Sequence, residues 1–290
     1  MEKLKPAKMS DILKLLKGSI DMHCHHGPDP FEERSVDALQ LIRQAQAAGM
    51  RAVVLKSPVY DTSPLAYIIN QIVPDNVCVG GICMDRTIGG LNPYALEAAA
   101  QMRAKVVWMP TSSYANANGV LKNPDVSGQG VTFSDDKGKL LPAVGDLLDI
   151  VKKYQMVLAT GHISVSDTLA LVDEARKKGI TKIVATHPMF AHRLEELQSL
   201  AKKGVFIEYL AVTLMDIDRL RKVEAREIIE SIKAVGAEHS IFCTDLGMAF
   251  NAVPVEGMRV GICTMLRYGL TEKEIELMIK VNPAELLDLN

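Results

Sequence analysis

Three histidines, an aspartate and a cysteine lie close together in the segment IDMHCHHGPDP, at residues 20–30. Imidazole nitrogens, carboxylate oxygens and thiolates are the side-chain ligands that zinc and related divalent metals take in proteins. Side chains two positions apart on a strand point the same way, so His23 and His25 would share a face, with Asp21 one layer deeper. A His-rich segment alone does not define a metal site. Further ligands must come from elsewhere in the chain.

Further polar residues follow other short apolar runs. Gly161 and His162 end the run VLATGH, His187 ends IVATH, and Asp245 ends IFCTD, and these three runs look alike. If the runs are parallel strands of a barrel, their side chains gather where the strands end. Four of the seven histidines would then share one end of the sheet with a carboxylate. Such a ligand set suits zinc, and also manganese, iron or nickel.

The elements that must position these residues are eight apolar runs of strand length, which alternate with helical segments. Near-continuous apolar strands indicate a parallel sheet covered on both faces. Eight units predict an α/β fold, a (β/α)8 TIM barrel forming a single domain over residues 1–290, with an extra N-terminal helix and C-terminal helices. A doubly wound open sheet is the alternative, but the sequence lacks the Gly-rich phosphate turn after its first strand. The expected strands lie near residues 19–25, 52–56, 77–84, 105–109, 156–160, 182–186, 205–210 and 240–244.

A long loop is expected after the fourth strand, at residues 110–142. It is rich in Gly, Asn, Asp and Ser and is long for a compact domain, so we expect a functional rim or lid. Within it, the segment GVTFSDDKGKLLP could form a hairpin with DDKG as its turn.

Composition and charge exclude several classes of protein. The 290 residues are 48% hydrophobic and 23% charged, as in an ordinary soluble globular protein. A net charge of -2 with no basic stripe argues against a nucleic-acid partner. No apolar run approaches the roughly 18 residues of a membrane span, and the start of the chain lacks the apolar core of a signal peptide. The five scattered cysteines fit reduced thiols, so we expect a cytoplasmic protein.

The order of these ligands resembles the amidohydrolase superfamily. The resemblance is carried by DMHCH at residues 21–25, by single histidines after the fifth and sixth strands and by an aspartate after the eighth. The ending NPAELLDL, at residues 282–289, is also similar to the tail of those enzymes. Together these features span nearly the whole chain.

The resemblance implies a role for each ligand candidate. His23 and His25 would bind the more buried metal ion, with Asp245 as an additional ligand. His162 and His187 would bind a second ion or, in one-metal members, serve the substrate. Asp245 would also shuttle protons. One or two divalent ions are therefore expected, with zinc as the first choice.

The fourth strand departs from the resemblance. Many two-metal members place a carbamylated lysine or a glutamate at its end, where this chain has MPTSS at residues 109–113. Lys56 closes the second apolar run, at the correct end of the barrel. A buried lysine can become a neutral amine that reacts with carbon dioxide or serves as a base. Lys56 is thus expected to be a carbamylated bridge or a catalytic group, or else a rim lysine that reaches solvent.

Four further residues are candidates for supporting roles. Asp21 and Glu208 would orient ligands from behind. Arg86, just beyond the third strand, could anchor an anionic substrate or form an ordinary ion pair. His192 could reach the site from the loop after the sixth strand.

These residues predict a metal-dependent hydrolase. A bound metal ion would lower the pKa of water to about 7, and the resulting hydroxide would attack an amide, lactone or ester in a small, anionic molecule. Decarboxylation, hydration and phosphate-ester cleavage on the same barrel are rival reactions. A non-catalytic metal-binding regulatory protein is the alternative of another class. The expected partner is a small-molecule substrate, and homo-oligomerisation is left open.

Overall fold

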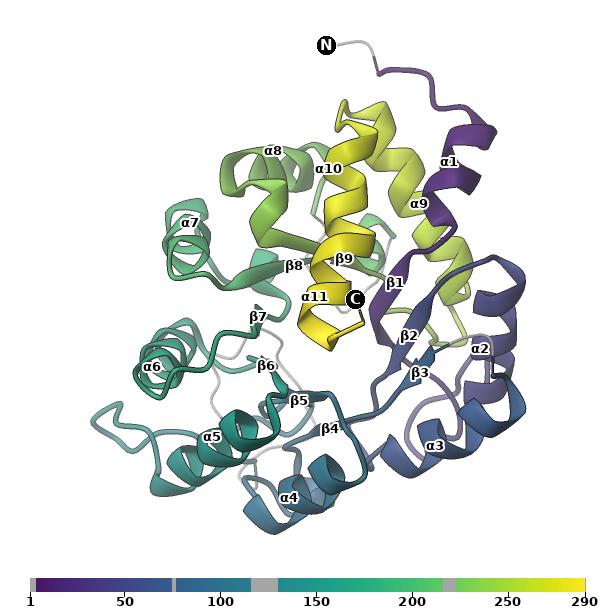
Figure 1. Ribbon diagram of the computed structural model, residues 1–290. Coiled ribbons are helices and arrows are strands. Elements are labelled where there is room, and N and C mark those ends of the chain that lie inside the picture. The colour runs from purple at the N-terminus through teal and green to yellow at the C-terminus, as the bar shows by residue number, and fades with distance from the viewer. Residues whose placement is uncertain (1–3, 75–76, 116–129, 216–222, 290) are drawn as a thin grey trace. The chain divides into compact units, whose positions relative to one another are not determined.

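The computed structural model describes residues 4–74, 77–115, 130–215 and 223–289. Strands and helices alternate along the chain (Figure 1). The strands are β1 (Ile20–Cys24), β2 (Ala52–Leu55), β3 (Val77–Val79), β4 (Gly81–Cys83), β5 (Val106–Trp108), β6 (Val157–Ala159), β7 (Ile183–Ala185), β8 (Phe206–Leu210) and β9 (Ser240–Cys243). The α-helices are α1 (Met9–Leu16), α2 (Ala38–Ala47), α3 (Ser63–Ile72), α4 (Pro93–Gln101), α5 (Pro142–Tyr154), α6 (Val165–Lys177), α7 (Leu194–Lys202), α8 (Ala225–Val235), α9 (Pro254–Arg267), α10 (Glu272–Glu276) and α11 (Asn282–Leu287). Shorter turns are η1 (Arg86–Ile88), η3 (Pro188–Phe190), η4 (Ala211–Leu214), η5 (Ala237–His239) and the π-helical η6 (Leu277–Val281).

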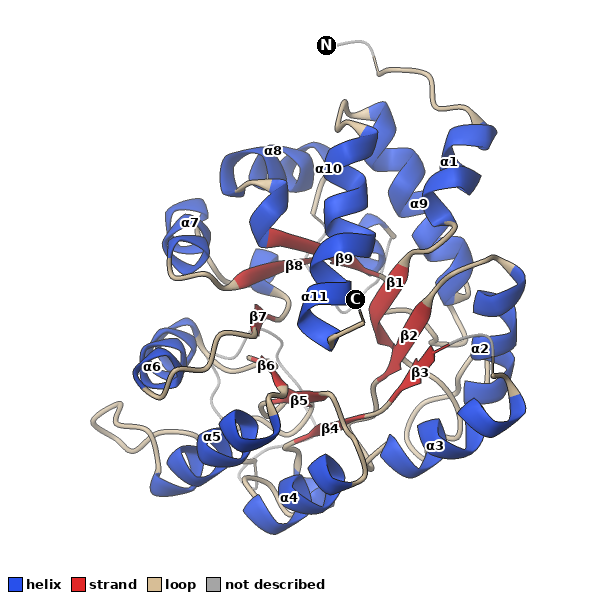
Figure 2. Ribbon diagram, in the orientation of Figure 1, coloured by secondary structure: helices blue, strands red, loops and turns tan. Residues whose placement is uncertain are grey.

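The chain divides into two compact units. The first comprises Met1–Leu55, Leu65–Val79 and Glu208–Asn290, and the second comprises Lys56–Pro64 and Gly80–Ile207. Figure 2 shows that both consist of short strands with helices around them. The regular alternation of strand and helix confirms the predicted α/β architecture.

In the first unit, β1, β2 and β3 form a parallel sheet in that order. Ile20 lies opposite Ala52, and Ala52 lies opposite Val77. Strand β9 contacts β1, the N-terminal helix α1 packs beside α9, and the C-terminal helix α11 contacts β1 and β9. The predicted extra N-terminal helix and C-terminal helices are therefore present.

In the second unit, β4, β5, β6 and β7 are parallel neighbours in chain order, and the start of β8 continues the series. Val106 lies opposite Gly81 on one side and Val157 on the other. Helices α4 and α5 pack against one another. This order is the one expected of consecutive βα units, in which each strand pairs with the next.

The third apolar run is two strands rather than the single strand expected over 77–84. Gly80 separates β3 from β4. Neither Gly80 nor the following Gly81 has room for a side chain. A Cβ on Gly80 would lie 2.5 Å from the Cα atom of Ser63, and one on Gly81 would lie 2.6 Å from the ring of Trp108. Close packing of other segments on these glycines therefore breaks the run.

The hairpin expected in the long loop is present in its described part. Ser134 and Leu140 form an antiparallel bridge, and the backbone N–H of Gly138 donates to the carbonyl of Asp135 at 2.9 Å. DDKG is thus the turn, with Gly138 in the left-handed conformation at φ 75°. Residues 116–129 of the loop lie outside the described residues.

Local sequence signals fix the helices that follow the strands. Asp37 and Gln40 form a capping box at the start of α2, with hydrogen bonds of 2.7 and 3.0 Å. The Ser164 hydroxyl accepts the backbone N–H of Asp167 and caps α6. Among the described residues, no helix has the length and apolar character needed to span a membrane.

Candidate metal centre

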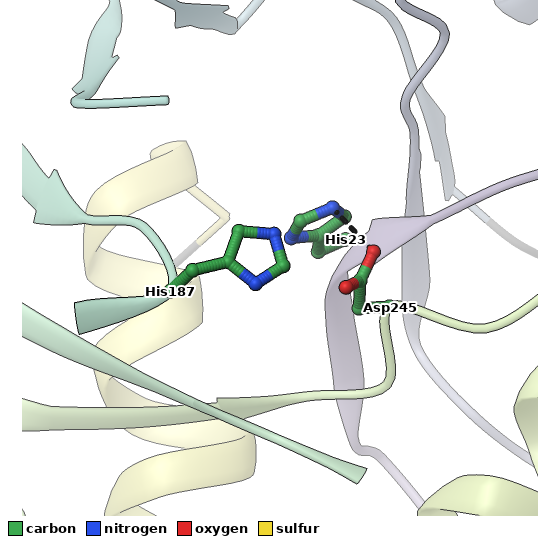
Figure 3. A group of neighbouring side chains, drawn as sticks. All are labelled: His23, His187 and Asp245. Carbon is green, nitrogen blue, oxygen red and sulfur yellow. Dashed lines mark ion pairs between the residues drawn. The ribbon is translucent and has the colours of Figure 1, made fainter. Parts of the chain in front are cut away.

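His23, at the end of β1, has a carboxylate at each ring nitrogen. Its Nδ1 lies 3.1 Å from Oε1 of Glu208, and its Nε2 lies 2.8 Å from Oδ1 of Asp245 (Figure 3). Glu208 comes from β8 and Asp245 follows β9, so three strands of the first unit supply the group. All three side chains are buried.

His25 brings a second imidazole to the same carboxylate oxygen. Its Nε2 lies 3.1 Å from Oδ1 of Asp245, and the rings of His23 and His25 are 5.5 Å apart. Backbone hydrogen bonds hold the two segments together: Asp245 donates to the His23 carbonyl and His25 to the Leu246 carbonyl, both at 2.8 Å. Two nitrogens and one oxygen therefore converge within a few ångströms, a combination of donors that zinc accepts.

The three look-alike runs share a backbone feature after their threonine. Gly161, His187 and Asp245 occupy that position, and all three are left-handed, with φ of 64°, 52° and 51°. A Cβ on Gly161 would lie 2.1 Å from the carbonyl oxygen of Met109, which explains the glycine. His187 and Asp245 adopt this left-handed conformation at a cost of about 1–3 kcal/mol each. Backbone strain of this kind is common at functional sites.

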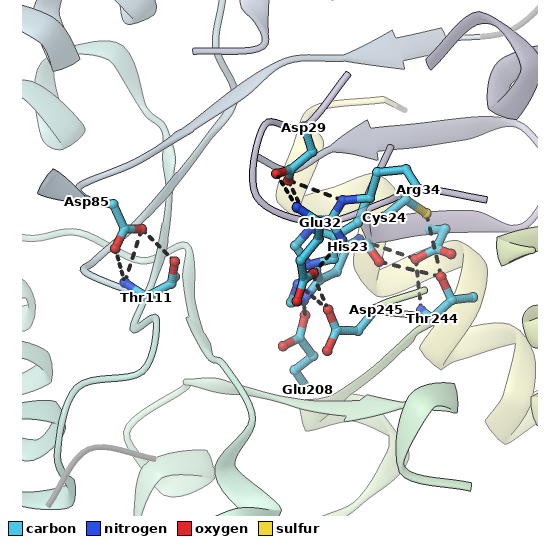
Figure 4. Close-up of polar contacts among 12 residues, drawn as sticks. His23, Cys24, Asp29, Glu32, Arg34, Asp85, Thr111, Glu208, Thr244 and Asp245 are labelled. Carbon is cyan, nitrogen blue, oxygen red and sulfur yellow. Dashed lines mark hydrogen bonds and ion pairs between the residues drawn. The ribbon is translucent and has the colours of Figure 1, made fainter. Parts of the chain in front are cut away.

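Asp21 lies behind the ligands and binds backbone rather than an imidazole. Its Oδ1 accepts the N–H groups of His23 at 3.2 Å and Thr244 at 3.0 Å (Figure 4). The Thr244 hydroxyl lies 3.6 Å from the sulfur of Cys24. Burial raises the pKa of the Asp21 carboxyl. Asp21 thus connects the end of β1 to the end of β9. The part that Thr244 takes was not predicted.

The second unit contains a pair of histidines. The rings of His162 and His187 are 4.8 Å apart at an angle of 77°, and Phe190 stacks on His187 at 5.7 Å. The backbone N–H of His162 donates to the carbonyl of Pro110 at 2.9 Å. Figure 3 also draws His187, which, like His23 and Asp245, offers one ligand atom to a metal ion.

Lys56 follows β2 and belongs to the second unit. The residue is buried, and its Nζ lies 5.8 Å from the centroid of the Trp108 ring, where a cation–π contact is favourable. Its charge also acts on the thiol of Cys83, whose pKa is raised chiefly by burial. The predicted bridging or catalytic role of Lys56 stays a prediction.

Arg86 begins the turn η1 after β4 and is exposed. It lines a pocket of about 420 Å³ together with Gly89, Gly90, Val131 and Thr132, among others. A guanidinium on the wall of a pocket rich in glycine backbone suits an anionic group.

A buried carboxylate next to Arg86 was missed by the sequence analysis. Asp85 accepts the backbone and hydroxyl hydrogens of both Thr111 and Ser113, at 2.5–3.2 Å (Figure 4 draws Asp85 and Thr111). The Ser113 hydroxyl in turn accepts the backbone N–H of Arg86 at 2.8 Å. Asp85 therefore fixes the backbone from which Arg86 projects. In the sequence, Asp85 follows one apolar run and Thr111 and Ser113 follow the next, but no local pattern pairs them.

His192 lies between η3 and α7 and is half-buried. Burial lowers the pKa of its imidazole, so the neutral form prevails at pH 7. Within the described part of the chain neither ring nitrogen has a hydrogen-bond partner, and both are shielded from solvent. A neutral ring with one donor and one acceptor nitrogen can bind a polar ligand.

Comparisons with solved structures show the fold. An amidohydrolase from Pseudomonas aeruginosa is similar at 12% identity, with a TM-score of 0.61, over 95% of this chain and 98% of the other. The probable dipeptidase PvdM of the same organism is similar at 11% identity and TM-score 0.70, over 97% and 98%. A 2,6-dihydroxybenzoate decarboxylase from Rhizobium is similar at 12% identity and TM-score 0.58, over 94% and 99%. The predicted (β/α)8 fold is thereby confirmed.

Sequence comparison gives a family. No curated protein matches the chain at a significant level. One family model matches residues 18–208, which is more than half of the chain and extends from β1 to β8. This chain therefore belongs to the family of unknown function DUF6282.

Proposed function

We propose that this protein is a metal-dependent hydrolase that cleaves an amide, lactone or ester bond in a small, anionic molecule. The observation that carries the proposal is the convergence of two imidazole nitrogens, from His23 and His25, on Oδ1 of Asp245. These donors fit a divalent ion, because zinc takes imidazole nitrogen and carboxylate oxygen as ligands. Manganese, iron and nickel are compatible with the same atoms.

His23, His25 and Asp245 are the proposed ligands of the first ion. His162 and His187 form a second pair of imidazoles, and we assign them to a second ion or to the substrate. A divalent ion at such ligands supplies a Lewis acid and acidifies water so that it can act as a nucleophile near pH 7.

The protein's own groups then handle protons and orientation. Asp245 is the proposed general base, accepting the proton of the attacking water on a carboxylate oxygen and passing it to the leaving nitrogen or oxygen. Glu208, at Nδ1 of His23, fixes the tautomer that keeps Nε2 available as a ligand. Lys56 is proposed either as a carbamylated metal bridge or as a basic amine. Mass spectrometry of the native protein under mild conditions separates these two states.

Two residues are proposed to bind the substrate. The Arg86 guanidinium would pair with its anionic group, held in place by the Asp85 and Ser113 contacts. His192 would accept a hydrogen bond from, or donate one to, the uncharged part of the substrate. A small carboxylate-bearing molecule is the substrate class that these two groups favour.

The test measures metal content and turnover together. The whole protein, purified from metal-supplemented medium, is analysed for bound metals and assayed on dipeptides, lactones, esters, aromatic carboxylates and phosphate esters, with and without chelator. We expect chelator-sensitive hydrolysis that returns when zinc is added back. Carbon dioxide release from the carboxylates would indicate the decarboxylase alternative, which the likeness to the Rhizobium enzyme makes worth an assay. Bound metal without turnover on any substrate would favour a regulatory protein, and no bound metal would overturn the proposal.

A further inference from the structure

Two phenylalanines are the most exposed apolar side chains on the loops that follow the metal ligands in the first unit. Phe31 is 74% exposed and Phe250 is 66% exposed. Phe31 comes six positions after His25, and Phe250 comes five positions after Asp245. The chain contains only six phenylalanines, so two of them in these positions call for an explanation.

Backbone pairing brings the two loops side by side. Arg34 and Met248 form an antiparallel bridge. The N–H of Ser35 donates to the Gly247 carbonyl at 2.9 Å, and the N–H of Ala249 donates to the Glu33 carbonyl at 3.0 Å. These contacts share one register, in which the paired residue numbers add to 282.

That register places the two phenylalanines at one end of the pairing. Phe31 lies two positions before the paired Glu33, and Phe250 follows the paired Ala249 in a turn in which the Asn251 N–H donates to the Met248 carbonyl at 3.0 Å. At the other end, Gly247 packs so tightly that a Cβ on it would lie 2.0 Å from the carbonyl oxygen of His25. The paired loops therefore extend from His25, a proposed metal ligand, to Phe31 and Phe250. We call these two phenylalanines the phenylalanine rim.

The loop that carries Phe31 is held by buried polar contacts. Asp29 accepts the N–H groups of Phe31 at 2.9 Å and Glu32 at 3.1 Å, and its other oxygen accepts the Arg34 guanidinium (Figure 4). Both the Asp29 and Arg34 side chains are at least 95% buried. These hydrogen bonds hold in place the backbone that carries the exposed Phe31 ring.

We propose that the phenylalanine rim contacts an apolar part of the substrate while the metal centre holds its polar, reactive part. The inference rests on the proposed function, and it adds the substrate class: an amphiphilic molecule with an aromatic or alkyl group beyond the scissile bond. An apolar group that leaves water on contact with Phe31 and Phe250 gains affinity in proportion to the area covered. These residues then determine specificity and take no part in the chemistry.

Hydroxamates test the inference because their head group chelates the metal and their tail can be varied. The zinc-loaded full-length protein is titrated with acetohydroxamate, benzohydroxamate and 4-phenylbutyrohydroxamate. We expect the longest tail to bind about tenfold more tightly than acetohydroxamate, as burial of several apolar carbons predicts. Substituting both Phe31→Ala and Phe250→Ala should remove most of that preference and affect acetohydroxamate far less. Tyr94→Ala, which removes an aromatic ring 89% exposed on α4, is the matched control and should keep the preference.

The outcomes separate the two proposals. If acetohydroxamate binds but the wild-type protein shows no tail preference, or the double variant keeps it, the rim does not contact substrate. A change of oligomeric state in the double variant, seen by light scattering, would show that the rim packs against a second copy and would also overturn the inference. If no hydroxamate binds the zinc-treated protein, the proposed metal centre fails and the rim inference fails with it.

Discussion

The Nδ1 atom of His23 lies 3.1 Å from Oε1 of Glu208, and both side chains are buried. A carboxylate at one ring nitrogen holds the proton there and leaves the other nitrogen as a lone-pair donor. The second nitrogen, Nε2, is the one directed at Asp245. In the proposed metal site, Glu208 would therefore leave Nε2 of His23 as the atom that binds the metal ion.

The first prediction concerns this partner. Glu208→Gln keeps the shape and a hydrogen-bond acceptor but loses the charge, and Glu208→Ala removes the contact altogether. We expect zinc affinity to fall about 10–100-fold for the alanine variant and less for the glutamine variant, as for other outer partners of ligating histidines. The zinc affinity of each protein is measured by competition with a chromogenic chelator. Equal affinity in wild type and both variants would mean that Glu208 does not orient His23.

The second prediction concerns Asp245. Asparagine tolerates the left-handed conformation that this position adopts at φ 51°, so Asp245→Asn should fold normally. The amide cannot accept a proton, and kcat/KM on any substrate found in the panel should fall about 10²–10⁴-fold. Asp173→Asn, which removes an exposed carboxylate on α6, is the control and should retain activity. Undiminished turnover in Asp245→Asn would remove Asp245 from the proton-transfer role.

The third prediction uses two glycines that differ in their surroundings. Gly161→Ala puts a methyl group 2.1 Å from the Met109 carbonyl oxygen in a left-handed backbone, so we expect a loss of at least about 2 kcal/mol in the free energy of unfolding. Gly145→Ala lies inside helix α5 with open space around it, and should gain up to about 1 kcal/mol. Urea unfolding followed by circular dichroism measures both. A Gly161→Ala protein as stable as Gly145→Ala would contradict this account of the β6 end.

Much of the site's placement was predictable from the sequence because it depends on strand periodicity. The positions of His23 and His25 follow from a period of two, and Asp245 follows from the apolar run before it. The similar endings of three runs even anticipate a shared backbone conformation. The sequence could not reveal how each apolar run is packed. VCVGGICM reads as one continuous strand, but the Ser63 backbone and the Trp108 ring pack against its two glycines.

Contacts between distant segments were the other part beyond sequence reasoning. Asp85 binding Thr111 and Ser113, and Asp21 binding the Thr244 N–H, join residues 26 to 223 positions apart. Nothing in the local pattern of either partner specifies the other. The 74% exposure of Phe31 is not apparent from the sequence either, although the hydrogen bond that holds its backbone is accepted by Asp29, only two positions earlier.

The fourth prediction is a pH dependence of stability at Asp29. Burial raises the pKa of this carboxyl, but hydrogen bonds from Arg34 and from the N–H groups of Phe31 and Glu32 outweigh it, so that the pKa lies below the ordinary 3.8. A carboxyl with a lowered pKa in the folded protein stabilises it above the unfolded pKa, and the contribution is lost as pH falls through the folded value. The contribution of Asp29 should therefore be complete at pH 6 and decline below about pH 4.

Asp29→Asn isolates that contribution from every other titrating group. The variant removes the buried carboxylate from the Arg34 guanidinium and leaves it only the more exposed Glu32, so we expect a loss of about 1–3 kcal/mol in the free energy of unfolding at pH 6. The difference from wild type should shrink toward pH 3, because the contribution of the ionised carboxylate diminishes once the pH falls below the unfolded pKa of 3.8. Glu33→Gln, an exposed carboxylate of the same loop, should cost little at either pH. A difference between wild type and Asp29→Asn that stays constant from pH 6 to pH 3 would mean that the charge of Asp29 does not stabilise the loop.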